Sequence, residues 1–299
     1  MTNTQLILEK IEKRSSFDNK DWKNDLDNNG YIVVENSEYM ENNLRKLQEV
    51  SAELLKSEGD KGGWEGKEKY FKPGKKFESG AQRLGGLVNK DKSFLGLISI
   101  PEILLASHHV IQNEIKICGM NLRNPNKGMG EQSLHIDGFP RNTEQEEFAG
   151  IVAFIYLDNA TLSNGAMRIV PKSHKKLGWP DDHVDISKLH SAEKRLEVKA
   201  GTIVVANLNI WHAGAKNETG ASRRVIMLNI KNRKYDQLLN YKRYLSKEFV
   251  NGLNEDQKYL LSVRNSDMEQ KLDSGGSANQ LRREYFKKKN NKFTSVANN

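Results

Sequence analysis

The feature that most constrains this chain is the triplet His135-Ile136-Asp137, followed 75 residues later by His212 and a further 11 residues on by Arg223. In an extended strand, side chains two residues apart point to the same face, so His135 and Asp137 can reach one metal ion. Two neutral imidazoles and one carboxylate on a single face of an ion form the facial triad associated with non-haem Fe(II), which leaves coordination positions open. A closed structural zinc site built on cysteine is excluded, because Cys118 is the only thiol.

The residues around these ligands have the composition of buried strands. Residues 150–157, 202–206 and 225–230 are β-branched or apolar runs of strand length, and residues 115–123 form a further such run. The second run ends shortly before His212, and the third follows Arg223 almost directly. We therefore expect the site to stand on a rigid sheet.

Four segments, taken in order, resemble the phytanoyl-CoA dioxygenase-like family of Fe(II)/2-oxoglutarate-dependent oxygenases. They are residues 27–34 (DNNGYIVV), 134–137 (LHID), 164–174 (NGAMRIVPKSH) and 211–224, which begins WHAG and ends SRR. The resemblance runs from about residue 25 to about residue 232. It implies a mainly β fold with flanking helices, whose core is a double-stranded β-helix of the jelly-roll, cupin-like type. It also implies that His135, Asp137 and His212 bind Fe(II), that 2-oxoglutarate and O2 are co-substrates, and that Arg223 pairs with the distal carboxylate of 2-oxoglutarate.

Three more residues are candidates for the co-substrate pocket: Gln132, Asn121 and Trp211. Trp211 has an equally plausible role as a packing residue that fixes the metal ligands. Strand alternation lets only one of Arg223 and Arg224 face inward, and spacing from His212 in the resembling family favours Arg223. The alternative is that both arginines end a surface strand and contact solvent.

The other histidines are expected to have structural or surface roles. His174 lies in a segment that forms a structural turn in the resembling family. His108 and His109 belong to an apolar, helix-like stretch at residues 103–111, whereas His183 and His190 lie in a charged segment that predicts a solvated loop or short helix.

Length and composition agree with one large β-domain that has helical additions. The chain has 299 residues, of which 36% are hydrophobic, which is enough for a sizeable core. No apolar run is long enough to span a bilayer, and the first residues lack the features of a secretory signal. With a single cysteine, these features predict a cytoplasmic protein.

We expect residues 1–234 to form the oxygenase domain with its N-terminal helices, and residues 235–299 to form a helical extension with a basic tail. Apolar residues recur at helical spacing in residues 39–56, which predicts an amphipathic helix on the core. Residues 59–76 are rich in Gly and Lys and predict a loop that either closes over substrate or serves as a solvated linker. Short helices are expected at residues 235–245 and 254–263.

The last 18 residues carry six basic side chains and one acidic side chain, which is five of the chain's net +8. A local excess of this kind argues against a nucleic-acid groove across the catalytic domain. The tail is either solvated or helps to recruit an acidic carrier protein that bears the substrate.

The leading hypothesis is a dioxygenase that hydroxylates a small metabolite, such as an amino acid or a natural-product intermediate. Halogenating relatives of the family typically have a small residue in place of the carboxylate ligand, so Asp137 favours hydroxylation, although desaturation and epoxidation stay open. One alternative is an oxygenase for carrier-bound or CoA-bound substrates, and another is a redox-inert metal hydrolase or isomerase. A non-catalytic binding module is the least compatible with an intact triad.

Overall fold

The computed structural model describes residues 1–17, 21–58 and 80–268, and within them the chain is built on two antiparallel sheets. The predicted loop at residues 59–76 and the basic tail lie outside the described residues. In spatial order, the strands of the larger sheet are β1 (Tyr31–Val34), β7 (Ile203–Asn207), β4 (Gly150–Tyr156), β9 (Val225–Asn232), β3 (Ile115–Pro125) and β2 (Ala81–Leu84). The smaller sheet has the order β6 (Lys194–Leu196), β5 (Met167–Val170) and β8 (Trp211–Ala213).

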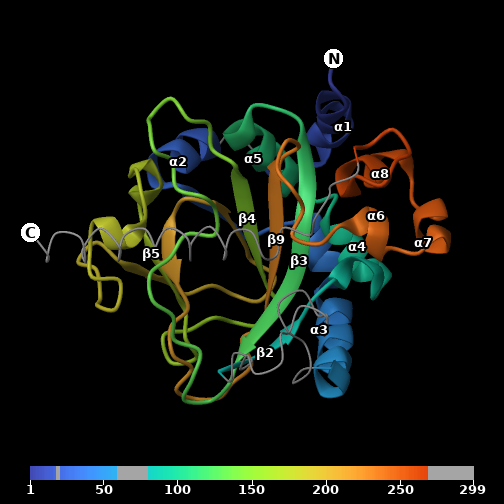
Figure 1. The fold of residues 1–299 in the computed structure, drawn as a ribbon. Helices are drawn as coiled ribbons and strands as arrows, with labels where there is room; N and C mark the ends of the chain where they lie inside the picture. Colours follow the sequence, from blue (N-terminus) through green and yellow to red (C-terminus); the bar gives the residue numbers. More distant parts are fainter. Residues whose placement is uncertain (18–20, 59–79, 269–299) are drawn as a thin grey trace, which may run out of the picture.

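The central strands β4 and β7 of the larger sheet are buried on both faces, which explains why their sequences are almost entirely apolar. In β4, Ile151 and Ile155 point toward the helices, whereas Val152 and Phe154 point toward the smaller sheet and share a cluster with Ile169 of β5. The space between the two sheets is therefore the interior of a jelly roll, and the mainly β fold expected from the sequence is confirmed. Figure 1 shows β5 on one side of the β4–β9–β3 layer and most of the helices on the other.

Eight α-helices within the described residues cover the outer face of the larger sheet or flank its edges. They are α1 (Asn3–Ile11), α2 (Trp22–Asn29), α3 (Glu38–Glu58), α4 (Lys92–Leu97), α5 (Pro101–Ile111), α6 (Tyr241–Tyr244), α7 (Lys247–Asn251) and α8 (Glu255–Leu261). Helix α3 contains the amphipathic helix predicted at residues 39–56, and α5 contains the predicted helical stretch at 103–111. No helix in this part of the chain is long and apolar enough to cross a membrane.

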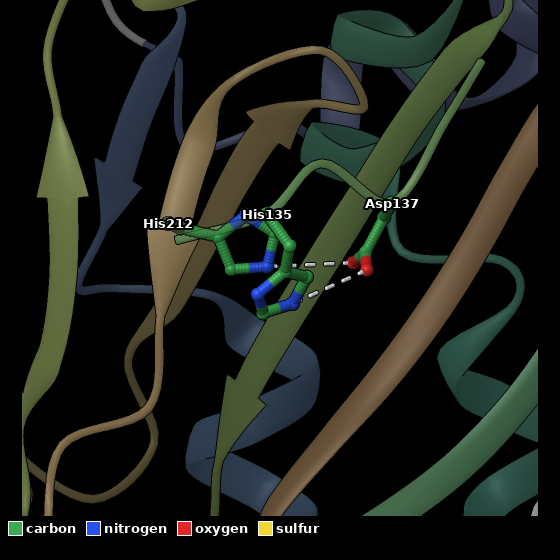
Figure 2. A group of neighbouring side chains, drawn as sticks. All are labelled: His135, Asp137 and His212. Atoms are coloured by element: carbon green, nitrogen blue, oxygen red, sulfur yellow. Dashed lines mark ion pairs between the residues drawn. The ribbon is translucent and has the colours of Figure 1, made fainter. Parts of the chain in front are cut away.

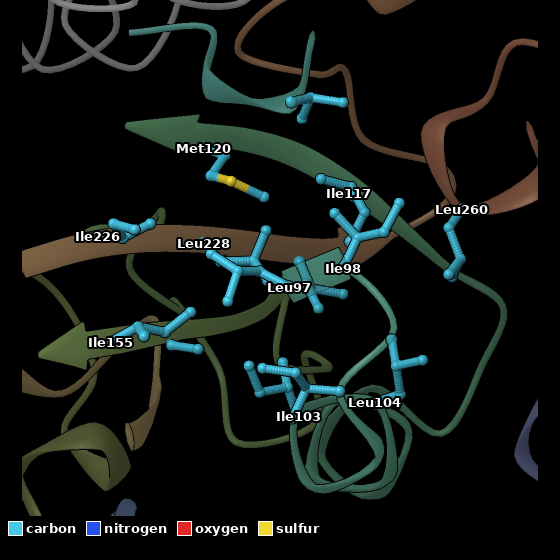
Figure 3. Packing of buried hydrophobic residues seen from close by; sticks show 14 of the residues in the cluster. Leu97, Ile98, Ile103, Leu104, Ile117, Met120, Ile155, Ile226, Leu228 and Leu260 are labelled. Carbon is cyan, nitrogen blue, oxygen red and sulfur yellow. The ribbon is translucent and has the colours of Figure 1, made fainter. Parts of the chain in front are cut away.

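The helices after β9 pack into the same core as the sheet. Leu260 of α8 belongs to one hydrophobic cluster with Ile117 of β3, Leu228 of β9 and Leu97 of α4, as Figure 3 shows. Helices were predicted at residues 235–245 and 254–263, and α6 and α8 lie within those ranges. The division of the chain at residue 234 stays a prediction.

Two of the segments that carried the family resemblance meet at the end of α2. Gly30 ends this helix with φ 85°, and a Cβ at this position would lie 2.4 Å from Nδ1 of His174. The Nε2 of His174 lies 3.2 Å from the carbonyl oxygen of Asp27, and the amide of Lys172 donates to the carbonyl of Asn29 at 2.9 Å. His174 is 2% exposed, and burial lowers its pKa to about 4. This residue therefore has the structural role that the sequence indicated.

The low pKa of His174 predicts a specific acid sensitivity. Its folded pKa of about 4 lies below the value of 6.5 for an unperturbed imidazole, so the unfolded chain binds more protons between these values. The contribution of the neutral His174 imidazole to the free energy of unfolding is fully present above pH 6.5 and is lost as the pH falls to 4. Over this interval, we expect the free energy of unfolding of the wild type to fall by up to about 3 kcal/mol more than that of His174→Gln. Urea unfolding at a series of pH values measures both slopes. The exposed His183→Gln is the control and should keep the wild-type slope, and equal slopes for all three proteins would contradict the assignment.

Candidate active site

The loop that carries two of the proposed ligands is held in place by the backbone of β8 and the residues before it. The amide of His135 donates to the carbonyl of His212, and the amide of His212 donates to the carbonyl of His135, both at 3.0 Å. Asp137 is held by a third bond, from its amide to the carbonyl of Leu208 at 3.1 Å. From the sequence, His135 and Asp137 were expected to share a regular extended strand. They lie instead in a loop that makes a single isolated bridge to β8.

The three side chains nevertheless converge, as Figure 2 shows. Their ligand atoms all lie within 4.8 Å of one another. The Nε2 of His135 is 3.8 Å from one carboxylate oxygen of Asp137, and the Nε2 of His212 is 3.6 Å from the other. Because the structure brings together residues 75 positions apart in the chain, this part of the sequence prediction has a geometric counterpart.

Backbone carbonyls orient both imidazoles. The Nδ1 of His135 lies 2.9 Å from the carbonyl oxygen of Ser133, and the Nδ1 of His212 lies 3.1 Å from that of Ile210. A carbonyl can only accept, so in a neutral ring Nδ1 carries the proton and Nε2 presents a lone pair. Each Nε2 faces the carboxylate of Asp137, which makes the cluster a donor set for a divalent metal, with its outer hydrogen bonds already made.

A buried guanidinium lies in the same interior. Arg223 is 5% exposed, and its Nε and Nη2 have no hydrogen-bond acceptor among the described residues. Burial lowers the pKa of Arg223 to about 10, Tyr156 opposes that change, and Arg123 adds to it. The group stays charged at neutral pH, and an unpaired buried cation is costly. Its two unused donors fit a carboxylate, which accepts a guanidinium through two parallel bonds.

Arg224 has a different role. Its Nε and Nη2 bind the two carboxylate oxygens of Asp158 at 2.8 and 2.6 Å, and its Nη1 donates to the carbonyl of Gln48 at 2.7 Å. This arginine therefore ties β9 to α3, and Arg223 is the member of the pair with donors to spare.

The remaining predicted pocket residues occupy three different environments. The side-chain oxygen of Gln132 accepts from the amide of Gly214 at 2.9 Å, which links the ligand-bearing loop to the segment after β8. Asn121 lies on β3 opposite Met227, which packs against the interior cluster between the sheets. Trp211 is 3% exposed and packs with Ile136 and other apolar residues in a separate cluster. Since alternate residues of a strand face opposite ways, Trp211 points away from the face of His212, in agreement with the packing role.

Sequence reasoning missed Tyr156. It is 1% exposed, burial raises its pKa to about 12, and the charge of Arg223 acts in the opposite direction. The alternation of β4 makes Tyr156 the next inward-facing residue after Phe154, whose ring lies 5.3 Å from that of His212. The available signal was a tyrosine hydroxyl in an otherwise apolar buried run.

Comparison with known proteins identifies the family. The family model for phytanoyl-CoA dioxygenase (PhyH) matches residues 26–225. The chain belongs to this family. Two relatives, an uncharacterized protein of Mycobacterium tuberculosis and one of Mycobacterium bovis, are each 26% identical over 195 residues. Each match covers 62% of this chain and 66% of the relative's own length, which is less than two thirds of either relative.

Solved structures of oxygenases share the fold of this family member. EctD from S. alaskensis with bound Fe superposes with a TM-score of 0.56 at 17% identity, covering 73% of this chain and 80% of EctD. The α-ketoglutarate-dependent carbocyclase SnoK of nogalamycin biosynthesis gives 0.54 at 16% identity, covering 73% of this chain and 85% of SnoK. HygX from Streptomyces hygroscopicus, with nickel, 2-oxoglutarate and hygromycin B bound, gives 0.52 at 13% identity, covering 71% and 86%.

The geometry of the triad predicts that metal binding by this PhyH-family chain depends on His135, Asp137 and His212. Replacing His212 by Ala removes one of three ligands, and loss of an outer-shell partner alone typically costs 10-fold to 100-fold, so we expect a weakening of about 100-fold or more. Titration of Ni(II) by calorimetry measures the dissociation constant. The exposed His183→Ala removes an imidazole that is outside the cluster and should bind Ni(II) as the wild type does. Unchanged affinity in His212→Ala would show that the metal binds elsewhere.

Proposed function

We propose that this chain is an Fe(II)/2-oxoglutarate-dependent dioxygenase that hydroxylates an unactivated C–H bond of a small metabolite, an amino acid or a natural-product intermediate. The observation that carries the proposal is the relation between the triad and Arg223 along one strand. Phe154 and Tyr156 are successive inward-facing residues of β4, about 7 Å apart at the rise of a strand. The first contacts the ring of His212, and the second interacts with Arg223.

A five-carbon dicarboxylate has the length to bridge such a span. One end can chelate a metal held by the triad, while the distal carboxylate meets the two unused donors of Arg223. The donor set of two imidazoles and a carboxylate suits Fe(II) and leaves positions for the co-substrate and for O2. The iron and 2-oxoglutarate bound in EctD and HygX structures support the same assignment.

When bound, the cofactors supply the oxidising chemistry: one oxygen atom of O2 enters the substrate C–H bond, and the other appears in succinate as 2-oxoglutarate loses CO2. The protein's own residues bind and orient. Arg223 fixes the distal end of 2-oxoglutarate, and the Ser133 and Ile210 carbonyls hold the two imidazoles in the tautomer that ligates. Phe154 covers one side of His212 with an apolar ring and excludes water from that side.

Hydroxylation is favoured within this class because Asp137 occupies the ligand position that a chloride ion would need for halogenation. Members of the fold carry out other outcomes, as the carbocyclase SnoK and the epimerase SnoN demonstrate. A redox-inert hydrolase or isomerase on the same barrel gives Arg223 no function. An oxygenase for a CoA-bound substrate is the second candidate, and the family description is the observation that favours it.

The proposal predicts turnover of 2-oxoglutarate without added substrate. Purified protein with Fe(II), ascorbate and 2-oxoglutarate in air should form succinate slowly, because members of this enzyme class decarboxylate the co-substrate without a substrate. Chromatographic detection of succinate with and without Fe(II) measures it. Complete absence of Fe(II)-dependent succinate in a protein that binds metal at the triad would contradict the oxygenase proposal.

Arg223→Met tests the co-substrate assignment through two readouts. Removing the buried guanidinium that pairs with a ligand carboxylate costs about 2 kcal/mol or more of binding free energy. The concentration of 2-oxoglutarate for half-maximal turnover should therefore rise by about 30-fold or more. Because the variant also removes an unpaired buried charge, its melting temperature without 2-oxoglutarate should equal or exceed that of the wild type. Arg195→Met, which changes a partly exposed arginine of β6, is the control and should alter neither value. Wild-type affinity for 2-oxoglutarate in Arg223→Met would refute the assignment.

A further inference from the structure

Two lysines lie directly opposite each other inside the barrel. Lys116 of β3 pairs with Lys231 of β9 in the antiparallel register, and the two residues are 8% and 6% exposed. Their strand neighbours Ile115, Ile117 and Ile230 belong to the core beneath the helices. By alternation, Lys116 and Lys231 point the other way, toward the space between the sheets.

This pair is costly for the folded protein. Like charges directly opposite on a sheet repel, and burial penalises the ammonium group of Lys116. Neither ammonium group forms a hydrogen bond or an ion pair with any residue in the described part of the chain. Burial lowers the pKa of Lys116, and so does Arg233; Cys118, Asp236 and Asp267 act in the opposite direction. Two apolar side chains could fill these positions without the charge repulsion or the cost of burying an ammonium group.

The lysine pair lies at the end of the barrel that carries Asp137. Lys231 is opposite Gly150, the first residue of β4. The carbonyl of Gly150 accepts from Leu208, whose own carbonyl accepts from the amide of Asp137. Arg223 interacts instead with Tyr156, the last residue of β4. The His-Asp-His triad therefore lies between two groups of positive charge. The guanidinium of Arg223 is toward one end of β4, and the ammonium groups of Lys116 and Lys231 are toward the other.

Polar side chains continue from the lysines along the inner face. Asn229 follows Lys231 at the next inward position, opposite Val152 of β4, and Asn121 lies opposite Met227 one step further. Neither amide has a side-chain hydrogen bond to any described residue, although Asn229 is only 7% exposed. A buried amide such as that of Asn229 is normally hydrogen-bonded, and Asn121 is half-buried. The two amides are therefore placed to meet a polar ligand.

We propose that Lys116 and Lys231 bind an anionic group of the substrate, a carboxylate or a phosphate-type oxyanion, at the end of the barrel opposite Arg223. The anion neutralises the facing ammonium groups, and the amides of Asn229 and Asn121 hydrogen-bond the part of the substrate that lies between the anion and the metal. This inference rests on the proposed function, because it takes the Arg223 end as the place of 2-oxoglutarate. The lysine subsite favours anionic metabolites over neutral ones, and the substrate and the co-substrate are each bound by their own basic residues.

Thermal unfolding of the full chain, loaded with Ni(II) and 2-oxoglutarate, tests this subsite directly. The probes are acetate for the carboxylate class and sulfate for the phosphate-type class, each compared with chloride at equal ionic strength. A ligand that binds only the folded state raises the melting temperature, and we expect a shift of about 2 °C or more for the class that fits. In Lys116→Met and Lys231→Met the melting temperature should no longer rise above its value in chloride. The control is Lys234→Met, which removes the same charge from an exposed ion pair with Glu147 and should keep the wild-type shift.

The variants also separate the subsite from general salt effects and from the co-substrate site. Removal of one of two facing charges should leave each variant at least as stable as the wild type in chloride, so a lost shift is not a loss of folding. A sulfate or acetate shift of equal size in all four proteins, or no shift in the wild type, would overturn the inference. The rise in melting temperature caused by 2-oxoglutarate should persist in both lysine variants. If that rise is absent from the wild type, the proposed function fails instead.

Discussion

The reciprocal backbone hydrogen bonds between His135 and His212 are the constraint on which the site depends. The loop before β4 has no regular strand to align it, so this one bridge sets the relative position of the two imidazoles. The bond from Asp137 to Leu208 then adds the carboxylate. Because these bonds use main-chain atoms only, the three side chains are left to ligate. The central strands of the larger sheet, which are buried on both faces, supply the rigidity that a ligand set needs.

Three basic residues are buried in the interior of this barrel without acidic partners in the described part of the chain. Arg223, Lys116 and Lys231 are each less than a tenth exposed, and none has an acidic partner within ion-pair distance in the described residues. Arg224, only one residue from Arg223, shows the structural alternative, since all three nitrogens of its guanidinium donate to Asp158 or Gln48. Uncompensated buried cations reduce stability, and ligands that neutralise them recover it. The two anion sites that we propose, one on each side of the His-Asp-His triad, would account for this cost in stability.

The sequence predicted those features that depend on local periodicity or on the family motif. The apolar spacing of residues 39–56 gave α3, and the apolar run at 150–157 gave β4. Features set by pairing between distant strands could not be read in this way. The opposition of Lys116 and Lys231 depends on a register that shifts at a bulge between Ile117 and Gly119. The bridge at His135 depends on β8, which is distant in the sequence, so a regular strand was predicted where the chain forms a loop.

The most direct test of this account is a crystal structure of the full chain with Ni(II) and 2-oxoglutarate. Anomalous scattering locates the metal independently of the protein chain. The account predicts one ion bound by Nε2 of His135, Nε2 of His212 and the carboxylate of Asp137, with the distal carboxylate of 2-oxoglutarate on Nε and Nη2 of Arg223. A metal bound by other residues, or a 2-oxoglutarate molecule whose distal carboxylate does not contact Arg223, would contradict it.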